Sequence, residues 1–518
     1  MRRFQSVAVA LVLGLAAPAC AQISPELSPQ PAPASAEMEK AFPAIDANFL
    51  AFQKAAHLPG IVWGVVQDGR IVHFGASGVQ DIETNAPVNS ETLFRIASMS
   101  KAFTALAILK LRDAGKLQLD APAETYVPEL KGWKYPTTDS PRIRVRDLLS
   151  HVAGFVTDDP WGDRQQPLSE EAFTRMLREG VPFERAPQTQ MESSNFGYAL
   201  LGRIITNVSG KPFDQYIMTE IMKPLGMMST TYEVRDAPAV RLAKGYRWEN
   251  DAWSLEPTMP HGVFGAMGGV VTSATDYEKW MSFLLDAWPA RDGAEKGPVK
   301  RSSVRELSQG LNFVSTGRRD GIEEGKPCSF GAAYAMGMNV AQDCDLGLTL
   351  THGGGYPGYG SGVLLLPEQG IGLFAFANRT YAGPGRANRE AALQLHKAGV
   401  LKDPEWQVSD ALAAAHKAVG AMYAAGSIEP GRAQLAMNFL MDRSPENWVK
   451  EFARLREQAG ECKPETPVEV GATGLMAGYF TWTCEKGEMD GNIVLAPTHT
   501  SQIQSLRFGF VPPNADKK

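Results

Sequence analysis

The hydrophobic pattern of the chain is interrupted by a Gly/Pro-rich stretch, residues 382–386, and restarts from Ser409. A chain of 518 residues is too long for one hydrophobic core, so this interruption predicts at least two domains. We expect a first domain over residues 41–397 and a second domain over residues 405–511. The polar tail that begins at Pro512 is expected to be loosely ordered.

The N-terminus has the features of an export signal. Two arginines precede an apolar run, residues 7–17, which is too short to span a bilayer, and small residues surround Cys20. We therefore expect a signal peptide over residues 1–21 and a soluble, secreted protein of the bacterial periplasm. Lipoprotein processing at Cys20 is the alternative. The Pro-rich residues 22–40 are expected to form a linker.

Charge and composition exclude several classes of function. The net charge is −6 and there is no long run of lysine and arginine, so neither nucleic acid nor an anionic membrane surface is favoured as a partner. No stretch after the signal is apolar enough for a transmembrane helix. We expect a small-molecule or peptide substrate, and a second domain that serves oligomerisation or partner binding.

Four cysteines follow the expected signal peptide and form two local pairs, Cys328 with Cys344 and Cys462 with Cys484. Neither pair has C-x-x-C spacing and no histidine cluster accompanies them, so a zinc site is not expected. In an oxidising compartment two disulfides are the favoured interpretation. Four free thiols are the alternative.

Both domains mix helix and strand signals, which predicts an α+β architecture. The hairpins expected in the first domain pair residues 61–66 with 69–74 and residues 362–366 with 370–377. Its expected helices, where apolar residues recur three and four apart, are 98–111, 196–208 and 275–285. The second domain is expected to have helices 409–425 and 445–458, followed by strands 476–484, 491–496 and 503–510.

Ser98 and Lys101 form a candidate catalytic pair. Residues three apart share one face of a helix, and a partly desolvated lysine can have a pKa low enough to accept a serine proton. The pair begins an apolar helical stretch, where backbone N–H groups can stabilise an oxyanion. A helix start with an exposed lysine is the alternative, because Ser-x-x-Lys spacing by itself is common.

Five segments in order along residues 45–380 carry a recognisable pattern: residues 94–101, 193–202, 224–227, 265–276 and 352–354. The first contains Ser98 and Lys101, the second contains Ser193 and Asn195, and His352 begins the third motif. These segments resemble the serine β-lactamase-like hydrolases. This family includes class C β-lactamases, related esterases, D-Ala-D-Ala carboxypeptidases and D-aminopeptidases.

The resemblance implies a role for each matched residue. Ser98 would attack a carbonyl carbon and form an acyl-enzyme, with Lys101 taking and relaying the proton. Asn195 would point its amide into the cleft, and His352 would line the opposite wall. The backbone N–H groups of Ser98 and Gly355 would form the oxyanion hole. Neither a metal nor an organic cofactor is required by this chemistry.

The resemblance also implies a fold and a substrate surface. The first domain would be β-lactamase/transpeptidase-like, with an antiparallel sheet flanked by helices and a helical subdomain. Gly353, Gly354 and Tyr356 would contact the substrate, and the loops at residues 156–167 and 312–327 would set selectivity. The second domain would be a small α+β domain, and its pattern faintly resembles the NTF2/cystatin fold.

Ser193 is the main departure from the family pattern. Close relatives carry Tyr-x-Asn in the second motif, with the tyrosine as proton shuttle or base, whereas Ser-x-Asn is typical of class A β-lactamases and many penicillin-binding proteins. Either Lys101 is the principal base with Ser193 as relay, or the site is weakened. Tyr356 and Tyr359 are candidates to replace the missing phenol, and Tyr198 is expected to lie in the core.

Taken together, these features predict an exported serine hydrolase that cleaves an ester or a peptide-like amide through acyl-Ser98, with Lys101 as base. A peptidase or esterase is favoured over a β-lactamase, because relatives use the missing tyrosine for efficient deacylation. A penicillin-binding carboxypeptidase or β-lactamase is one alternative. A non-catalytic envelope binding protein is the other. His151 and Gly154, in a Leu-Leu-x-His-x-x-Gly stretch, are expected to be structural.

Overall fold

The computed structural model describes residues 31–323, 325–402, 408–464, 468 and 474–513. The chain divides into two compact units, with the boundary between Lys402 and Asp403. The expected signal peptide, residues 1–21, lies outside the described residues. Among the helices that are described, none combines the length and the apolar character needed to cross a membrane.

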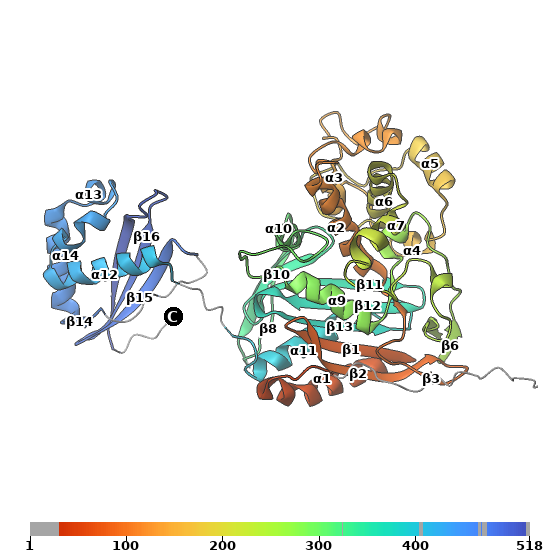
Figure 1. Cartoon of the computed structure of the whole chain (residues 1–518), viewed down its shortest axis with the longest axis horizontal. Coiled ribbons are helices and arrows are strands. Elements are labelled where there is room, and N and C mark those ends of the chain that lie inside the picture. The colour runs from red at the N-terminus through yellow and green to blue at the C-terminus, as the bar shows by residue number, and fades with distance from the viewer. Residues whose placement is uncertain (1–30, 324, 403–407, 465–467, 469–473, 514–518) are drawn as a thin grey trace, which may run out of the picture. The chain divides into compact units, whose positions relative to one another are not determined.

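A nine-stranded antiparallel sheet forms the centre of the first unit (Figure 1). Its strands are β1 (Gly60–Gln67), β2 (Arg70–Asp81), β3 (Ala86–Pro87), β8 (Asn312–Asp320), β9 (Pro327–Tyr334), β10 (Asn339–Asp343), β11 (Gly347–Tyr356), β12 (Tyr359–Leu366) and β13 (Ile371–Ala377). The order across the sheet is β3-β2-β1-β13-β12-β11-β10-β9-β8. Strand β1 pairs with both β2 and β13, so the two predicted hairpins are confirmed and lie side by side.

Helices cover both faces of this sheet, which explains the nearly continuous apolar sequence of its central strands. Trp63 and Val65 of β1 belong to one core with α1 and α11, whereas Val62 and Val66 belong to a second core that contains α9. Figure 1 shows α1 and α11 together on one side of the sheet. The bounds are α1 (Ala36–Ala55), α9 (Ala274–Leu285) and α11 (Gly385–Lys397).

A cluster of helices extends the second core beyond the sheet (Figure 1). At its centre lies α2, which is buried around most of its circumference, in agreement with its apolar sequence. The three predicted helices are confirmed, although the first begins as a 3-10 turn, Ala97–Met99, before α2 starts. The helices of the cluster are α2 (Ser100–Asp113), α3 (Val145–Leu149), α4 (Trp161–Arg164), α5 (Glu170–Glu179), α6 (Asn195–Ser209) and α7 (Phe213–Ile217).

Two expectations about the first unit were wrong. Helix α1 begins at Ala36, inside the stretch expected to be a linker, because the Ser35 side chain caps the helix by accepting from the Met38 N–H at 3.2 Å. The expected selectivity loop at residues 312–327 is largely strand β8. This strand is the edge of the sheet, and its residues 315–320 are all polar or glycine, which gives it a loop-like sequence.

The second unit packs helices against a four-stranded antiparallel sheet, as predicted. Phe480 and Trp482 alternate inward along β15 and pack with Leu412 and Phe452 of the helices. The buried Trp482 Nε1 also donates to His416 Nε2 at 3.0 Å. The elements are α12 (Asp410–Ala425), α13 (Phe439–Asp442), α14 (Pro445–Ala459), β14 (Cys462–Lys463), β15 (Ala477–Cys484), β16 (Gly487–Leu495) and β17 (Ile503–Val511).

Both local cysteine pairs lie at disulfide distance, with S–S 2.08 Å for Cys328–Cys344 and 1.98 Å for Cys462–Cys484. The first pair ties β9 to the turn between β10 and β11. The second joins β14 to β15 at directly facing residues. Within the described part of the chain, one group of side chains lies close enough together to hold a metal ion: Cys328, Cys344 and Asp345. Its two sulfur atoms are bonded to each other.

Candidate active site

Ser98 lies in the 3-10 turn Ala97–Met99, called here the serine turn, directly before α2. Ala97 has a φ of 49°, in the left-handed region that L-residues seldom adopt, so the backbone changes direction sharply at this point. Ala97 and Met99 are buried, whereas Ser98 is partly exposed. The serine turn therefore presents one hydroxyl from an otherwise buried backbone.

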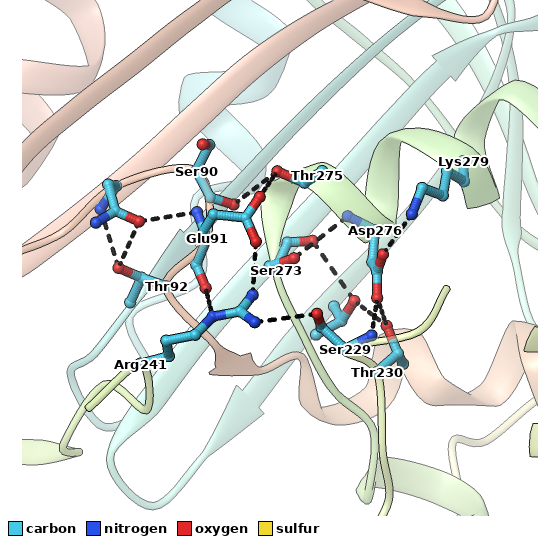
Figure 2. Close-up of polar contacts among 12 residues, drawn as sticks. Ser90, Glu91, Thr92, Ser229, Thr230, Arg241, Ser273, Thr275, Asp276 and Lys279 are labelled. Atoms are coloured by element: carbon cyan, nitrogen blue, oxygen red, sulfur yellow. Dashed lines mark hydrogen bonds and ion pairs between the residues drawn. The ribbon is translucent and has the colours of Figure 1, made fainter. Parts of the chain in front are cut away.

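A polar network fixes the segment that leads into the serine turn (Figure 2). The Glu91 carboxylate accepts hydrogen bonds from Arg241 Nη2 at 2.7 Å and from the Thr275 hydroxyl. Arg241 also donates to Ser229 Oγ at 3.1 Å, and the Ser229 N–H donates to Asp276 at 2.7 Å. The network joins three segments that are distant in sequence, and it anchors the approach to the serine turn on the start of α9.

Lys101 lies one helical turn after Ser98 and is only 1% exposed. Its Nζ lies 2.7 Å from Ser98 Oγ and 2.9 Å from Asn195 Oδ1. Burial disfavours the ammonium form and lowers the pKa of Lys101, and nearby carboxylates partly oppose this effect. The unprotonated amine at this place can accept the Ser98 proton, so the structure brings three predicted site residues into contact.

An acidic loop, residues 156–167, which contains the short helix α4, lies beside this group. Its Asp159 carboxylate accepts a hydrogen bond from Asn195 Nδ2. Asp158 accepts from the N–H of Asn195 and from the next N–H at the start of α6. Sequence reasoning assigned this loop to selectivity and missed its carboxylates. The signal was available, because Asp158, Asp159 and Asp163 fall within six residues of one loop.

Asp163 connects the acidic loop to the third motif. It is 1% exposed and accepts a hydrogen bond from the Tyr381 hydroxyl at 3.0 Å. Burial, reinforced by the charge of Asp159, raises the pKa of Asp163 to about 7. The Tyr381 ring lies against Gly355, where a Cβ atom would come within 2.8 Å of Tyr381 Cδ1. Tyr381 was not predicted, and its contact with the loop spans 218 residues of sequence.

Strand β11 runs closely past the serine turn. A Cβ atom on Gly354 would lie 2.3 Å from the Ile96 carbonyl oxygen and 3.1 Å from Ala97 Cβ. Glycine is therefore needed at this residue for the strand to approach the turn, and Gly354 has no side chain with which to contact a substrate. Gly353 is exposed on the same strand, where its backbone is accessible.

The backbone direction of Gly355 fits the predicted oxyanion hole. The two-residue turn between β11 and β12 makes Tyr356 and Tyr359 a directly facing pair. Successive residues of a strand direct their N–H groups to opposite sides, so the Gly355 N–H points away from β12. Strand β10 pairs with β11 only as far as Thr351, which leaves that side of Gly355 unpaired with β10.

His352 is held by Tyr334, a residue that sequence reasoning did not identify. The Tyr334 hydroxyl lies 3.1 Å from His352 Nε2, and His352 Nδ1 lies 2.6 Å from the Gly353 carbonyl oxygen. Burial, with the nearby Lys101, lowers the pKa of His352 to about 4. His352 is therefore neutral at physiological pH, with both ring nitrogens close to oxygen atoms.

His151 has the structural contacts that were expected. Its Nδ1 accepts a hydrogen bond from the Ser194 N–H at 3.2 Å, and its ring packs on Tyr334 with centroids 4.6 Å apart. Burial holds the pKa of His151 well below its usual value. This neutral histidine supports the N-terminal end of α6, where Ser194 is the N-cap.

Ser193 and the candidate substitute tyrosines do not join the Ser98–Lys101 pair. Among the described residues, the Ser193 hydroxyl has no hydrogen-bond partner. Tyr359 donates its hydroxyl to the Ala243 carbonyl at 2.7 Å, which is a structural contact. Tyr356, predicted to bind substrate, is 1% exposed.

Tyr356 and Tyr198 make their contacts within the core. The Tyr356 ring lies 4.8 Å from the guanidinium carbon of Arg95, inside the core. Tyr198 lies in the core as expected and donates its hydroxyl to the Leu149 carbonyl at 2.8 Å. No tyrosine in the described part of the chain is hydrogen-bonded to Ser98 or Lys101.

Comparisons with known proteins agree with this geometry. A family model described as Beta-lactamase matches residues 45–397. Protein flp from Staphylococcus aureus (strain MW2) is 29% identical over 330 residues, which is 62% of this chain and 60% of that protein. Beta-lactamase-like protein 2 from Dictyostelium discoideum is 29% identical over 266 residues, which is 49% of this chain and 47% of that protein. The chain thus spans less than two thirds of these relatives.

A solved structure supports the fold. The octameric penicillin-binding protein homologue from Pyrococcus abyssi has a TM-score of 0.55 and 20% sequence identity, covering 88% of this chain and 96% of that one. The predicted β-lactamase/transpeptidase-like fold is therefore confirmed. Because the family model matches more than half of its residues, this chain belongs to the β-lactamase family.

Proposed function

We propose that this protein is an exported serine hydrolase that cleaves an ester or a peptide-like amide through an acyl-Ser98 intermediate. The contacts of Lys101 carry the proposal. This buried amine lies 2.7 Å from Ser98 Oγ and 2.9 Å from Asn195 Oδ1, so it faces the hydroxyl with a lowered pKa. Such an arrangement turns an ordinary serine into a nucleophile.

The acylation step follows from these contacts. Lys101 takes the proton of Ser98 as Oγ bonds to the substrate carbonyl carbon. The negative charge that develops on the carbonyl oxygen is stabilised by the N–H groups of Ser98 and Gly355. When the intermediate collapses, Lys101 gives its proton to the departing alcohol or amine, and the acyl group remains on Ser98.

The proposal includes a compartment and a role for the second unit. Two cysteine pairs at disulfide distance support an oxidising location, and the N-terminal signal pattern supports the bacterial periplasm. We assign oligomerisation or partner binding to the second unit. Light scattering on the mature protein, with and without residues 405–511, tests this assignment through a change in assembly state.

Turnover of model substrates tests the proposed function. The mature protein is assayed with p-nitrophenyl butyrate and with a peptide ending in D-Ala-D-Ala, beside Ser98→Ala, Lys101→Met and the exposed control Lys116→Met. Each of the two site variants should lose at least about 1000-fold in kcat/KM, while the control keeps the wild-type value. Undiminished turnover in Ser98→Ala would contradict the proposal.

Adding benzylpenicillin, a cephalosporin and a ligand-binding measurement to this assay separates the alternatives. A penicillin-binding carboxypeptidase would form a long-lived adduct with benzylpenicillin and would release D-alanine from the peptide. A β-lactamase would hydrolyse a cephalosporin rapidly. A non-catalytic binding protein would bind a ligand equally well in wild type and Ser98→Ala, with no turnover in either.

A further inference from the structure

Hydrolysis of an acyl-serine needs a group that takes a proton from the attacking water. The second-motif tyrosine that relatives use is absent, and Ser193 has no hydrogen-bond partner among the described residues. His352 is neutral, and its ring nitrogens lie beside Tyr334 and the Gly353 carbonyl. We propose that Asp159 is the general base that activates this water. This inference rests on the proposed function and concerns only its second half-reaction.

Asp159 is connected to the acylated serine by a short chain of hydrogen bonds. Its carboxylate accepts from Asn195 Nδ2, and the oxygen of the same amide accepts from Lys101 Nζ at 2.9 Å. Lys101 Nζ in turn lies 2.7 Å from Ser98 Oγ. The amide of Asn195 thus gives its donor to the carboxylate and its acceptor to the amine, which is the arrangement that both neighbours require.

Solvent access distinguishes Asp159 from the two neighbouring carboxylates. Asp158 is half-buried, and its two oxygens accept backbone N–H groups at the start of α6. Asp163 is buried and bonded to Tyr381. Asp159 is exposed, and its Oδ2 has no hydrogen-bond partner among the described residues. One oxygen is therefore anchored on the catalytic amide while the other is free to hold a water.

The charge around Asp159 suits this role. Asp159 is the carboxylate with the largest electrostatic effect on Lys101, ahead of Asp163 and Asp158. His151 and His352, which also lie near Lys101, have lowered pKa values and remain neutral, and the Tyr198 ring lies 5.6 Å from Lys101 Nζ. Asp159 thus combines proximity to the amine with direct access to solvent.

Deacylation transfers the acyl group from Ser98 to water. The carboxylate of Asp159 takes one proton from a water molecule as the water oxygen bonds to the acyl carbon, and the N–H groups of Ser98 and Gly355 stabilise the oxyanion. The bond between the acyl carbon and Ser98 Oγ then breaks. The proton held by Asp159 passes by way of solvent water to Lys101, because the Asn195 amide separates these two side chains, and Lys101 gives a proton to Oγ. This restores the serine hydroxyl, the neutral amine and the carboxylate, and the carboxylic acid is released.

A burst experiment tests this assignment. The experiment compares four proteins: wild type, Asp159→Asn, Asp159→Glu and the exposed control Asp139→Asn. Each is mixed with p-nitrophenyl butyrate in a stopped-flow instrument, and quenched samples are analysed by intact mass spectrometry. The burst of p-nitrophenol reports acylation, and the later linear phase reports deacylation. Circular dichroism and thermal melting confirm that each variant is folded.

The assignment predicts a separation of the two phases. Asp159→Asn should keep a burst of one equivalent at close to the wild-type rate, while its linear phase falls at least about 100-fold and the butyryl adduct accumulates. Asp159→Glu should recover part of the linear rate, and Asp139→Asn should match wild type. Hydroxylamine, a stronger nucleophile than water, should release the adduct of Asp159→Asn.

Other outcomes overturn the assignment in distinguishable ways. A wild-type linear phase in Asp159→Asn would remove Asp159 from the reaction and leave the proposed function intact. Loss of the burst itself would show that Asp159 acts in acylation or in holding Asn195, and the assignment as deacylation base would be wrong. No release of p-nitrophenol and no Ser98 adduct in wild type would overturn the proposed function, and this inference with it.

Discussion

Replacing Asp163 with asparagine should stabilise the first unit at neutral and alkaline pH. The Asp163 side chain is buried, and its pKa is raised from 3.8 to about 7 by burial and by the charge of Asp159. The folded protein therefore binds this proton more tightly than the unfolded chain does. The resulting stabilisation is complete below pH 3.8 and is lost as the pH rises through about 7.

The magnitude follows from the two pKa values. Each pH unit between them corresponds to about 1.4 kcal/mol, so ionising Asp163 in the folded state costs up to about 4 kcal/mol above pH 7. Asparagine does not ionise, and its carbonyl oxygen can still accept the hydrogen bond from Tyr381. Between pH 5 and pH 8, the free energy of unfolding of Asp163→Asn minus that of wild type should grow by about 2 to 3 kcal/mol.

Urea denaturation of both proteins at half-unit steps from pH 5 to pH 8 measures this difference, followed by tryptophan fluorescence. The transition of the second unit serves as an internal control, because the substitution lies outside it. A stability difference that stays constant over this range would refute the reasoning, since it would mean that Asp163 is ionised throughout. A stability difference that shrinks with rising pH would refute the predicted sign of the effect.

Three further predictions concern other parts of the chain. Gly354→Ala should slow the p-nitrophenol burst at least about 10-fold, because the new Cβ would meet the Ile96 carbonyl oxygen at 2.3 Å, and a normal burst would contradict the close approach of β11. Replacing Cys462 and Cys484 together by alanine should destabilise the second unit by about 3 kcal/mol in urea, with the burst unchanged; equal stability would argue against that disulfide. His352, whose pKa is lowered to about 4, should show no titration between pH 6 and pH 8 in nuclear magnetic resonance spectra, and a midpoint near 6.5 would contradict its burial.

The elements with strong local patterns were predictable from the sequence. The hairpins β1–β2 and β12–β13 and the helices α2, α6 and α9 lie in the core, where side-chain burial imposes a clear period on the residues. The polar edge strand β8 and the start of α1 were missed. The start of α1 follows prolines and depends on the Ser35 cap, whereas β8 is mostly polar and is a strand because it pairs with β9.

The candidate site was predictable only in its motif-bearing part. Ser98, Lys101 and Asn195 belong to recognisable segments, and the structure brings them into contact. The partners Tyr334 and Tyr381 carry no local signal. Tyr334 meets His352 across the sheet, and Tyr381 meets the acidic loop from 218 residues away, so only the folded chain reveals them.

The replacement of tyrosine by Ser193 has a different meaning in the structure than in the sequence. As a sequence change it suggests either a weakened site or a serine relay. In the structure the Ser193 hydroxyl makes no hydrogen bond to Lys101, whereas Asp159 of the acidic loop accepts a hydrogen bond from the Asn195 amide. The loss of the phenol is thus accompanied by a carboxylate, which the sequence alone placed in a selectivity loop.

The central claim is that Ser98 is an activated nucleophile. The most direct test is intact mass spectrometry of the mature protein after incubation with a fluorophosphonate probe, followed by peptide mapping, with Ser98→Ala as control. We predict one covalent adduct per chain, located on Ser98 and absent from the variant. An unmodified wild-type protein, or an adduct that persists in Ser98→Ala, would contradict it.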